Sequence, residues 1–113
     1  MKAQAMIDCG ICGFHSKVRA ESDDSQMVQL KLTSGCEKAA AFGQALAAKG
    51  PVDGYAEIGA GSDGVVLTTA RESLKGCCAA CAVPVGVFKA MQVAAGVALP
   101  KDISIRISHS DES

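Results

Sequence analysis

Aromatic residues are scarce in this 113-residue chain, which has no tryptophan, one tyrosine and three phenylalanines. Its core must therefore be aliphatic, and apolar residues, at 49% of the chain, suffice for one packed domain. Charged residues make up 20% and the formal net charge is −1. The chain lacks both the basic patch and the stacking aromatics that nucleic-acid binding uses, so we expect no nucleic-acid partner.

Long apolar runs are also missing. The longest candidate, residues 79–98, is interrupted by Pro84, Lys89 and Gln92, and a membrane helix needs about 20 predominantly apolar residues. The apolar run at the N-terminus is short and contains Gln4, unlike a signal peptide. We therefore expect a cytoplasmic protein with no membrane partner. In that reducing compartment cysteines are typically metal ligands or redox groups rather than disulfides.

Cysteine is the residue type that the chain has in excess. Six cysteines fall into three groups, each with a glycine beside it. A fold that gathers the groups would place four or more thiolates together, which is the donor set of a zinc ion or an iron–sulfur cluster. The groups are Cys9 with Cys12, Cys36 alone, and Cys77 with Cys78 and Cys81.

Alternating apolar and polar residues predict strands over residues 3–8, 14–21 and 27–33, the last two forming a hairpin. A capping box formed by Ser34 and Glu37 predicts a helix over residues 37–49 with Ser34 as its N-cap, ended by Gly50-Pro51. Residues 50–64 contain five glycines and indicate a loop, with a short strand at 55–58.

The second half of the chain is predicted to contain two more helices and one strand. One helix runs from Thr69 to Gly76; another has Pro84 in its first turn and ends at Leu99-Pro100. Alternating isoleucines predict a last strand over residues 103–107. The order is strand-strand-strand-helix-helix-helix-strand, an α+β fold with a small, mostly antiparallel sheet and helices packed on one face. Residues 1–108 would form a single cysteine-rich domain, and residues 109–113 a frayed tail.

The cysteines lie at the junctions between these elements. Cys36 falls in the first turn of the helix over 37–49, where free N–H groups and the helix dipole favour a thiolate. The third group lies in the turn before the last helix. Cys9 is the best candidate for a thiol that only fills the core. The predicted metal ligands are Cys12, Cys36, Cys78 and one of Cys77 or Cys81.

Three short motifs give the chain a family resemblance. Cys12-Gly13 precedes the hairpin, Gly35-Cys36 opens a helix, and Cys77-Cys78 precedes the last helix. In order and spacing this resembles the NifU-like iron–sulfur scaffold proteins over roughly residues 5–97. The resemblance implies that Cys12, Cys36 and Cys78 hold a cluster, with Cys77 in the place of a histidine. Phe14 replaces the aspartate of that family, which implies tighter retention of metal.

Residues 74–84 and 88–96 are also similar to an uncharacterised family of small cysteine-rich proteins from anaerobic microbes. That resemblance covers the cysteine-rich turn and the helix after it.

The patterns leave three hypotheses open. The first is a metal-binding protein that stores, assembles or passes on a cluster or zinc ion, in contact with a protein partner. The second is a sulfur-transfer protein in which the thiolate of Cys36 attacks and a cysteine of the third group resolves the product. The third is a structural zinc module that presents a surface to a partner. The sequence shows no recognisable pattern of a Ser-His-Asp or Cys-His catalytic site, which favours a binding protein over an enzyme.

Overall fold

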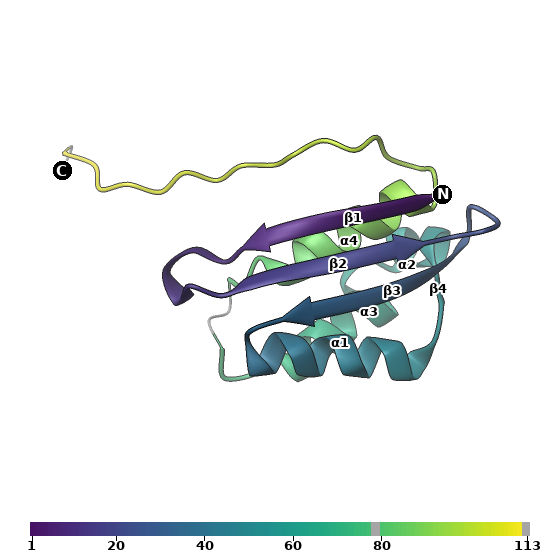
Figure 1. The fold of residues 1–113 in the computed structure, drawn as a ribbon, viewed down its shortest axis with the longest axis horizontal. Coiled ribbons are helices and arrows are strands. Elements are labelled where there is room, and N and C mark those ends of the chain that lie inside the picture. The colour runs from purple at the N-terminus through teal and green to yellow at the C-terminus, as the bar shows by residue number, and fades with distance from the viewer. Residues whose placement is uncertain (78–79, 112–113) are drawn as a thin grey trace.

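The computed structural model describes residues 1–77 and 80–111 (Figure 1). A four-stranded antiparallel sheet has the order β1-β2-β3-β4. The strands predicted at 3–8, 14–21 and 27–33, and the hairpin between the last two, are confirmed. The strands are β1 (Lys2–Asp8), β2 (His15–Glu21), β3 (Met27–Ser34) and β4 (Val52–Asp53).

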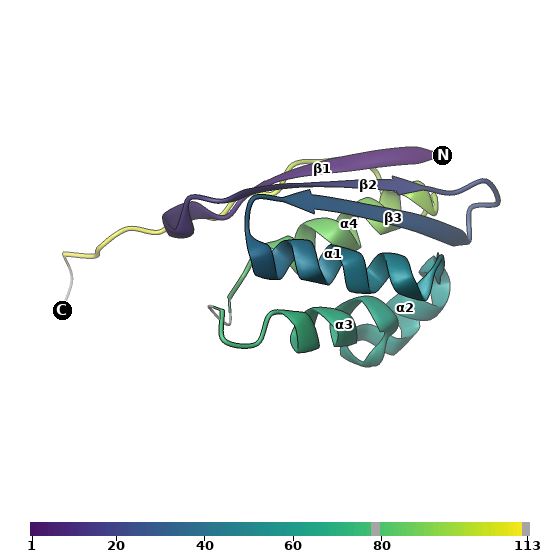
Figure 2. The ribbon, with the colours of Figure 1, turned by 60° about the horizontal axis from the view of Figure 1, so that its bottom comes forward.

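All four helices lie on one side of the sheet (Figure 2). Helix α1 (Glu37–Lys49) packs on β3, and α4 (Val83–Ala94) packs on β1 and β2. Helix α3 (Val65–Ser73) packs against α1 and α4 behind them, next to the short helix α2 (Gly54–Ala60). The fold is therefore α+β, as predicted, with the helices on a single face of the sheet.

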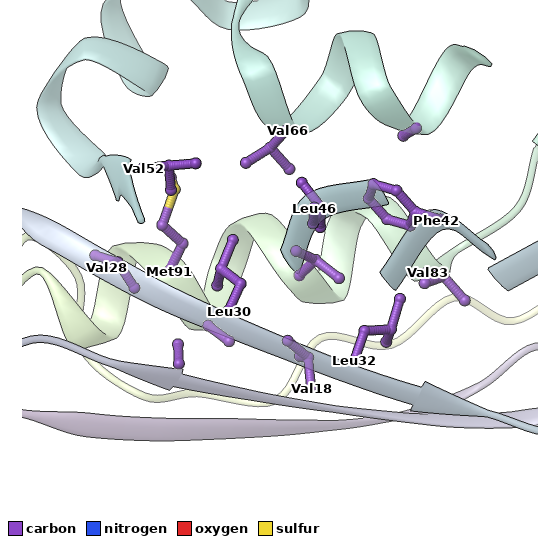
Figure 3. Close-up of a cluster of buried hydrophobic side chains, with 14 of the residues drawn as sticks. Val18, Val28, Leu30, Leu32, Phe42, Leu46, Val52, Val66, Val83 and Met91 are labelled. Carbon is purple, nitrogen blue, oxygen red and sulfur yellow. The ribbon is translucent and has the colours of Figure 1, made fainter. Parts of the chain in front are cut away.

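The alternation of side chains along the strands explains which face of the sheet packs against the helices. The inward residues of β2 and β3 are buried, and Val18 lies opposite Leu32 across the pair. The outward positions are mostly polar and at least partly exposed, so the sheet has one apolar and one solvated face. The core fills the space between the inward face and α1, α3 and α4 (Figure 3). It includes Val18, Val28, Leu30, Leu32, Phe42, Leu46, Val52, Val66, Val83 and Met91.

The middle of the chain differs from the prediction. Residues 55–58 lie in α2 rather than in a strand, because Asp53 caps that helix by accepting hydrogen bonds from the N–H groups of Tyr55 and Ala56. Helix α3 spans Val65–Ser73, so the predicted start at Thr69 and end at Gly76 were wrong. Its N-terminal N–H groups are bonded by the carboxylate of Glu57, eight residues upstream of Val65, which a local sequence pattern does not reveal.

The predicted last helix is confirmed at its start and wrong at its end. Pro84 lies in the first turn of α4 as predicted. The helix ends at Ala94 rather than at Leu99-Pro100, since Gly96 follows with φ 79°, a left-handed conformation that ends a helix.

The strand predicted over residues 103–107 is absent from the described part of the chain, and these residues form an exposed extended tail. A strand requires a hydrogen-bonded neighbour, and alternation alone does not supply one. The element order is consequently β1-β2-β3-α1-β4-α2-α3-α4, rather than the one predicted.

Candidate thiol site at one end of the sheet

The three cysteine groups lie at the same end of the molecule because of the strand order. β1 and β3 run in the same direction, so their C-terminal ends lie at the same end of the sheet. Helix α1 also begins there (Figure 1). β1 leads into Cys9, β3 leads into Cys36, and Cys81 lies just before α4. Cys9, Cys36 and Cys81 are all partly buried and pack against the same hydrophobic core.

Close packing of α4 on β1 fixes the third group beside the first. A Cβ atom placed on Gly86 would lie 2.5 Å from Cγ1 of Ile7, so only a glycine permits this approach. Ile7 is two residues before Cys9, and Gly86 is in the first turns of α4, five residues after Cys81. The helix crossing therefore brings two groups together that are about 70 residues apart in the chain.

The first group forms a tight turn. The 3-10 turn η1 (Gly10–Cys12) follows β1, and Asp8 stabilises it by accepting a hydrogen bond from the N–H of Gly10 at 3.0 Å. The thiol of Cys12 donates to the carbonyl of Cys9 at 3.9 Å, and Cys12 is exposed. This turn keeps the first group compact, with one half-buried thiol and one in solvent.

Cys36 is the N-cap residue of α1, not a residue of its first turn, so the prediction of Ser34 as N-cap was wrong. Ser34 ends β3, and its hydroxyl accepts a hydrogen bond from the N–H of Cys36 at 3.1 Å. The buried hydroxyl of Ser16 donates to the same oxygen at 2.8 Å. Cys36 is thus held at the helix start by a network anchored in two strands.

The third group is held by α1 as well as by α4. The ammonium of Lys38, in the first turn of α1, donates to the carbonyl of Lys75. The N–H of Cys77 donates to the carbonyl of Leu74 at 3.1 Å, and Cys77 and Cys81 are half-buried. The predicted ligand Cys78 lies outside the described residues. Lys38 therefore joins the segment before Cys77 to the helix that Cys36 begins.

The proximity of the sulfurs is seen in the acidity of Cys9. Its pKa rises from the ordinary 9.0 to about 11, chiefly because burial disfavours the charged thiolate. The neighbouring sulfurs of Cys81, Cys12 and, least, Cys36 also contribute to this rise in pKa. One thiol of the first group is thus within electrostatic reach of the second and third groups, and it is protonated at neutral pH.

The structure brings the predicted ligands Cys12 and Cys36, and Cys81, one of the two alternatives for the fourth ligand, to one end of the molecule. Cys9, the thiol expected to fill the core, lies there too and packs against the core. All five cysteines that the structure describes are free thiols. Among residues 1–77 and 80–111, however, no group of three His, Cys, Asp or Glu side chains is arranged to hold a metal ion. The gathered thiols are neighbours without being a formed coordination site.

A family of unknown function, DUF6951, matches residues 3–107. The chain belongs to this family. The DUF6951 match spans β1 to the tail, and so includes all six cysteines and the isoleucines of residues 103–107. No curated protein and no solved structure matches the chain. None of the helices described for this DUF6951 protein has the length and apolar character of a membrane span.

Proposed function

We propose that four of the five thiols at the thiol end, defined as Cys9, Cys12, Cys36, Cys77 and Cys81, bind a zinc ion or an iron–sulfur cluster as thiolates. The protein would store the cofactor or pass it to a protein partner. The observation that supports this proposal is that Cys9, Cys36 and Cys81, which come from three separate parts of the chain, pack against the same core at one end of the sheet. Cys81, Cys12 and Cys36 also contribute to the raised pKa of Cys9. Thiolate sulfur is the donor that zinc and iron–sulfur clusters share.

Four of these thiols form the proposed donor set. Cys12 and Cys36 are predicted ligands, Cys81 is one of the two alternatives for the fourth, and the predicted ligand Cys78 lies outside the described residues. We add Cys9 to the set because it packs against the same core as Cys36 and Cys81, and the sulfurs of Cys81, Cys12 and Cys36 influence its pKa. Cys36 is fixed by hydrogen bonds, whereas Cys12 is on an exposed turn between two glycines with φ near 78°. Cofactor binding would therefore draw the η1 turn and the segment carrying Cys81 toward Cys36.

Deprotonation is part of the proposed binding reaction. A thiol must lose its proton to become a metal ligand, so each thiol that ligates releases a proton when the metal binds. The raised pKa of Cys9 means that this residue is protonated at neutral pH in the free protein. Metal affinity should therefore increase as pH rises.

Metal analysis of protein purified without oxygen tests the proposal. Iron and sulfide in proportion, with a brown colour, would identify a cluster; a single bound zinc would identify a zinc site. We expect Cys36→Ser and Cys9→Ser to lose the metal while Cys77→Ser, the matched control from the same end, retains it. Circular dichroism of each variant shows whether the fold survives.

Two results would overturn the proposal. The first is full metal content in a folded Cys36→Ser variant. The second is metal-free wild-type protein, prepared without oxygen and resupplied with iron and sulfide or zinc, that binds none of them. If that metal-free protein catalysed thiol exchange and the Cys36→Ser variant did not, the sulfur-transfer hypothesis would replace the metal site.

A further inference from the structure

The C-terminal tail carries the pattern of a strand that has found no neighbour. Residues 103–107 alternate isoleucine with serine and arginine, so an extended conformation places the three isoleucines on one side. Their exposed fractions are 57% for Ile103, 79% for Ile105 and 92% for Ile107. A monomer with this tail leaves a row of large apolar side chains in water, which indicates a missing contact surface.

The unpaired edge of β1 is a surface to which an extended segment such as residues 103–107 can add. β1 pairs with β2 along one edge, and in the described part of the chain no strand pairs with its other edge. Such an edge presents a row of unpaired N–H and C=O groups that can accept a further strand. β1 has seven residues, enough to pair with the five residues of the alternating tail.

The tail of the same chain does not fill this edge. In Figure 1 the tail leaves the region of the N-terminus and runs beside β1 in the same direction. Within the described residues, no backbone hydrogen bond joins residues 103–107 to β1. Residues 103–107 are therefore extended and are paired with no strand in the described part of the chain. Residues 95–102 link them to α4.

We propose that the tail of each chain adds as a fifth strand to the β1 edge of a second copy, forming a two-fold dimer by reciprocal exchange. A second copy carries the same unpaired β1 edge and the same segment 103–107. In one two-fold symmetric arrangement, each segment pairs with the β1 edge of the other copy. The DUF6951 match extends through residue 107 and thus includes the three isoleucines in the family's own domain. The proposal does not depend on the metal site.

The side-chain pattern selects the direction of the added strand. The inward residues of β1 are Ala3, Ala5 and Ile7, and the isoleucines of the tail would continue that apolar face. In the parallel register that sets Ile103 beside Ala3, Asp102 lies beside Lys2. In the antiparallel register that sets Ile107 beside Ala3, Asp102 would instead meet Asp8, and like charges directly opposite destabilise a sheet. The exchanged strand is therefore parallel to β1.

The test is the molar mass of the full chain in solution, by light scattering after size-exclusion chromatography. A reducing agent and a chelator exclude dimers made by disulfides or metal. We expect a dimer for the wild type and, for Ile105→Lys, at least a tenfold weaker association. Arg106→Gln alters the polar side of the same strand and should remain a dimer. Because Ile105 is exposed, the fold of Ile105→Lys should be unchanged by circular dichroism.

Hydrogen exchange of the tail distinguishes the occupants of the β1 edge. Slowly exchanging amides at 103–107 in a dimer, lost in Ile105→Lys, would support the exchange. A monomer with protected tail amides would show that the tail pairs with its own chain, and a monomer with unprotected amides would show no pairing. Either monomer overturns the proposal, as does a dimer that Ile105→Lys leaves intact.

Discussion

The hydroxyl of Ser34 accepts a hydrogen bond from the backbone N–H of Cys36 at 3.1 Å. This contact joins the last residue of β3 to the N-cap residue of α1 and sets where the middle cysteine lies. Ser16, buried to 3% exposure, donates its own hydroxyl proton to Ser34. A pair of serines in neighbouring strands therefore positions Cys36.

Replacing the acceptor tests this network. Ser34→Ala leaves the Ser16 hydroxyl without its partner in a buried place, so we expect a loss of about 1–3 kcal/mol in the free energy of unfolding. Urea denaturation measures the change. Thr33→Ala, at the neighbouring exposed position of β3, is the control and should change stability much less. Equal stability of the two variants would contradict the role assigned to Ser34.

Gly86 should not tolerate even a methyl group. The Cβ atom of Gly86→Ala would lie 2.5 and 2.6 Å from two carbon atoms of Ile7, so α4 must shift away from β1. Overpacking of this kind costs about 1–3 kcal/mol. Gly59→Ala in α2 is the control, since a Cβ there meets nothing within 4 Å. Thermal unfolding compares them, and Ile7→Val should recover part of the loss in Gly86→Ala.

The start of α3 should depend on Glu57. Its buried carboxylate accepts hydrogen bonds from the N–H of Val65 at 3.0 Å and that of Val66 at 2.6 Å. Glu57→Gln replaces one acceptor oxygen with a donor, and we expect a loss of about 1–3 kcal/mol by chemical denaturation. Glu72→Gln, an exposed glutamate of α3, should be nearly neutral. A neutral Glu57→Gln would show that α3 begins without this cap.

Cys9 should make the metal-free protein less stable in alkali. Its pKa is about 11 in the folded state and near the ordinary 9.0 when unfolded, so the unfolded chain loses this proton first as pH rises. The contribution to stability is complete below pH 9 and is lost as pH rises from 9 to 11. Urea midpoints measured across that window should fall less in Cys9→Ser than in the wild type. An identical fall in both proteins would contradict the raised pKa.

Lys38 should act on the proposed metal site without contacting the metal. Its hydrogen bond to the carbonyl of Lys75 holds the segment before Cys77 against α1, so Lys38→Met should weaken metal binding by a few-fold. Competition with a chromophoric chelator measures the affinity. Lys89→Met removes an exposed lysine of α4 and is the matched control. The same affinity in both variants, with the fold retained, would remove Lys38 from the site.

The parts of the fold that sequence reasoning predicted correctly are those specified by near neighbours in the chain. Alternation placed the residues of β2 and β3 on the correct faces, with Val18 and Leu30 inward. The bounds of α1 followed from its alanine-rich body and from Gly50, whose φ of 75° ends the helix. Two failures have distant causes, namely the capping of α3 by Glu57 and the lack of a paired strand for residues 103–107 in the described part of the chain. The missed start of α2 at Asp53 and the missed end of α4 before Gly96 have local causes.

For the candidate site, too, some features could be predicted from the sequence and others depend on distant contacts. Glycine-flanked cysteines at element junctions predicted Cys12, Cys36, Cys78 and one of Cys77 or Cys81 as ligands, because junctions are where a small domain can bring separate segments together. The proximity of Cys9 to the third group had no local signal. It follows from the contacts of α4 with β1, which bring Cys81 within electrostatic reach of Cys9.

The sequence by itself determined that this is an α+β protein with an aliphatic core and cysteines at the junctions of its elements, because composition and short-range periodicity are properties of consecutive residues. Only the tertiary structure decided that the three cysteine groups share one end of the sheet and that residues 103–107 pair with no strand in the described part of the chain. Both depend on contacts between residues far apart in the chain. Such contacts are decided by the joint packing of the whole core rather than by any one segment.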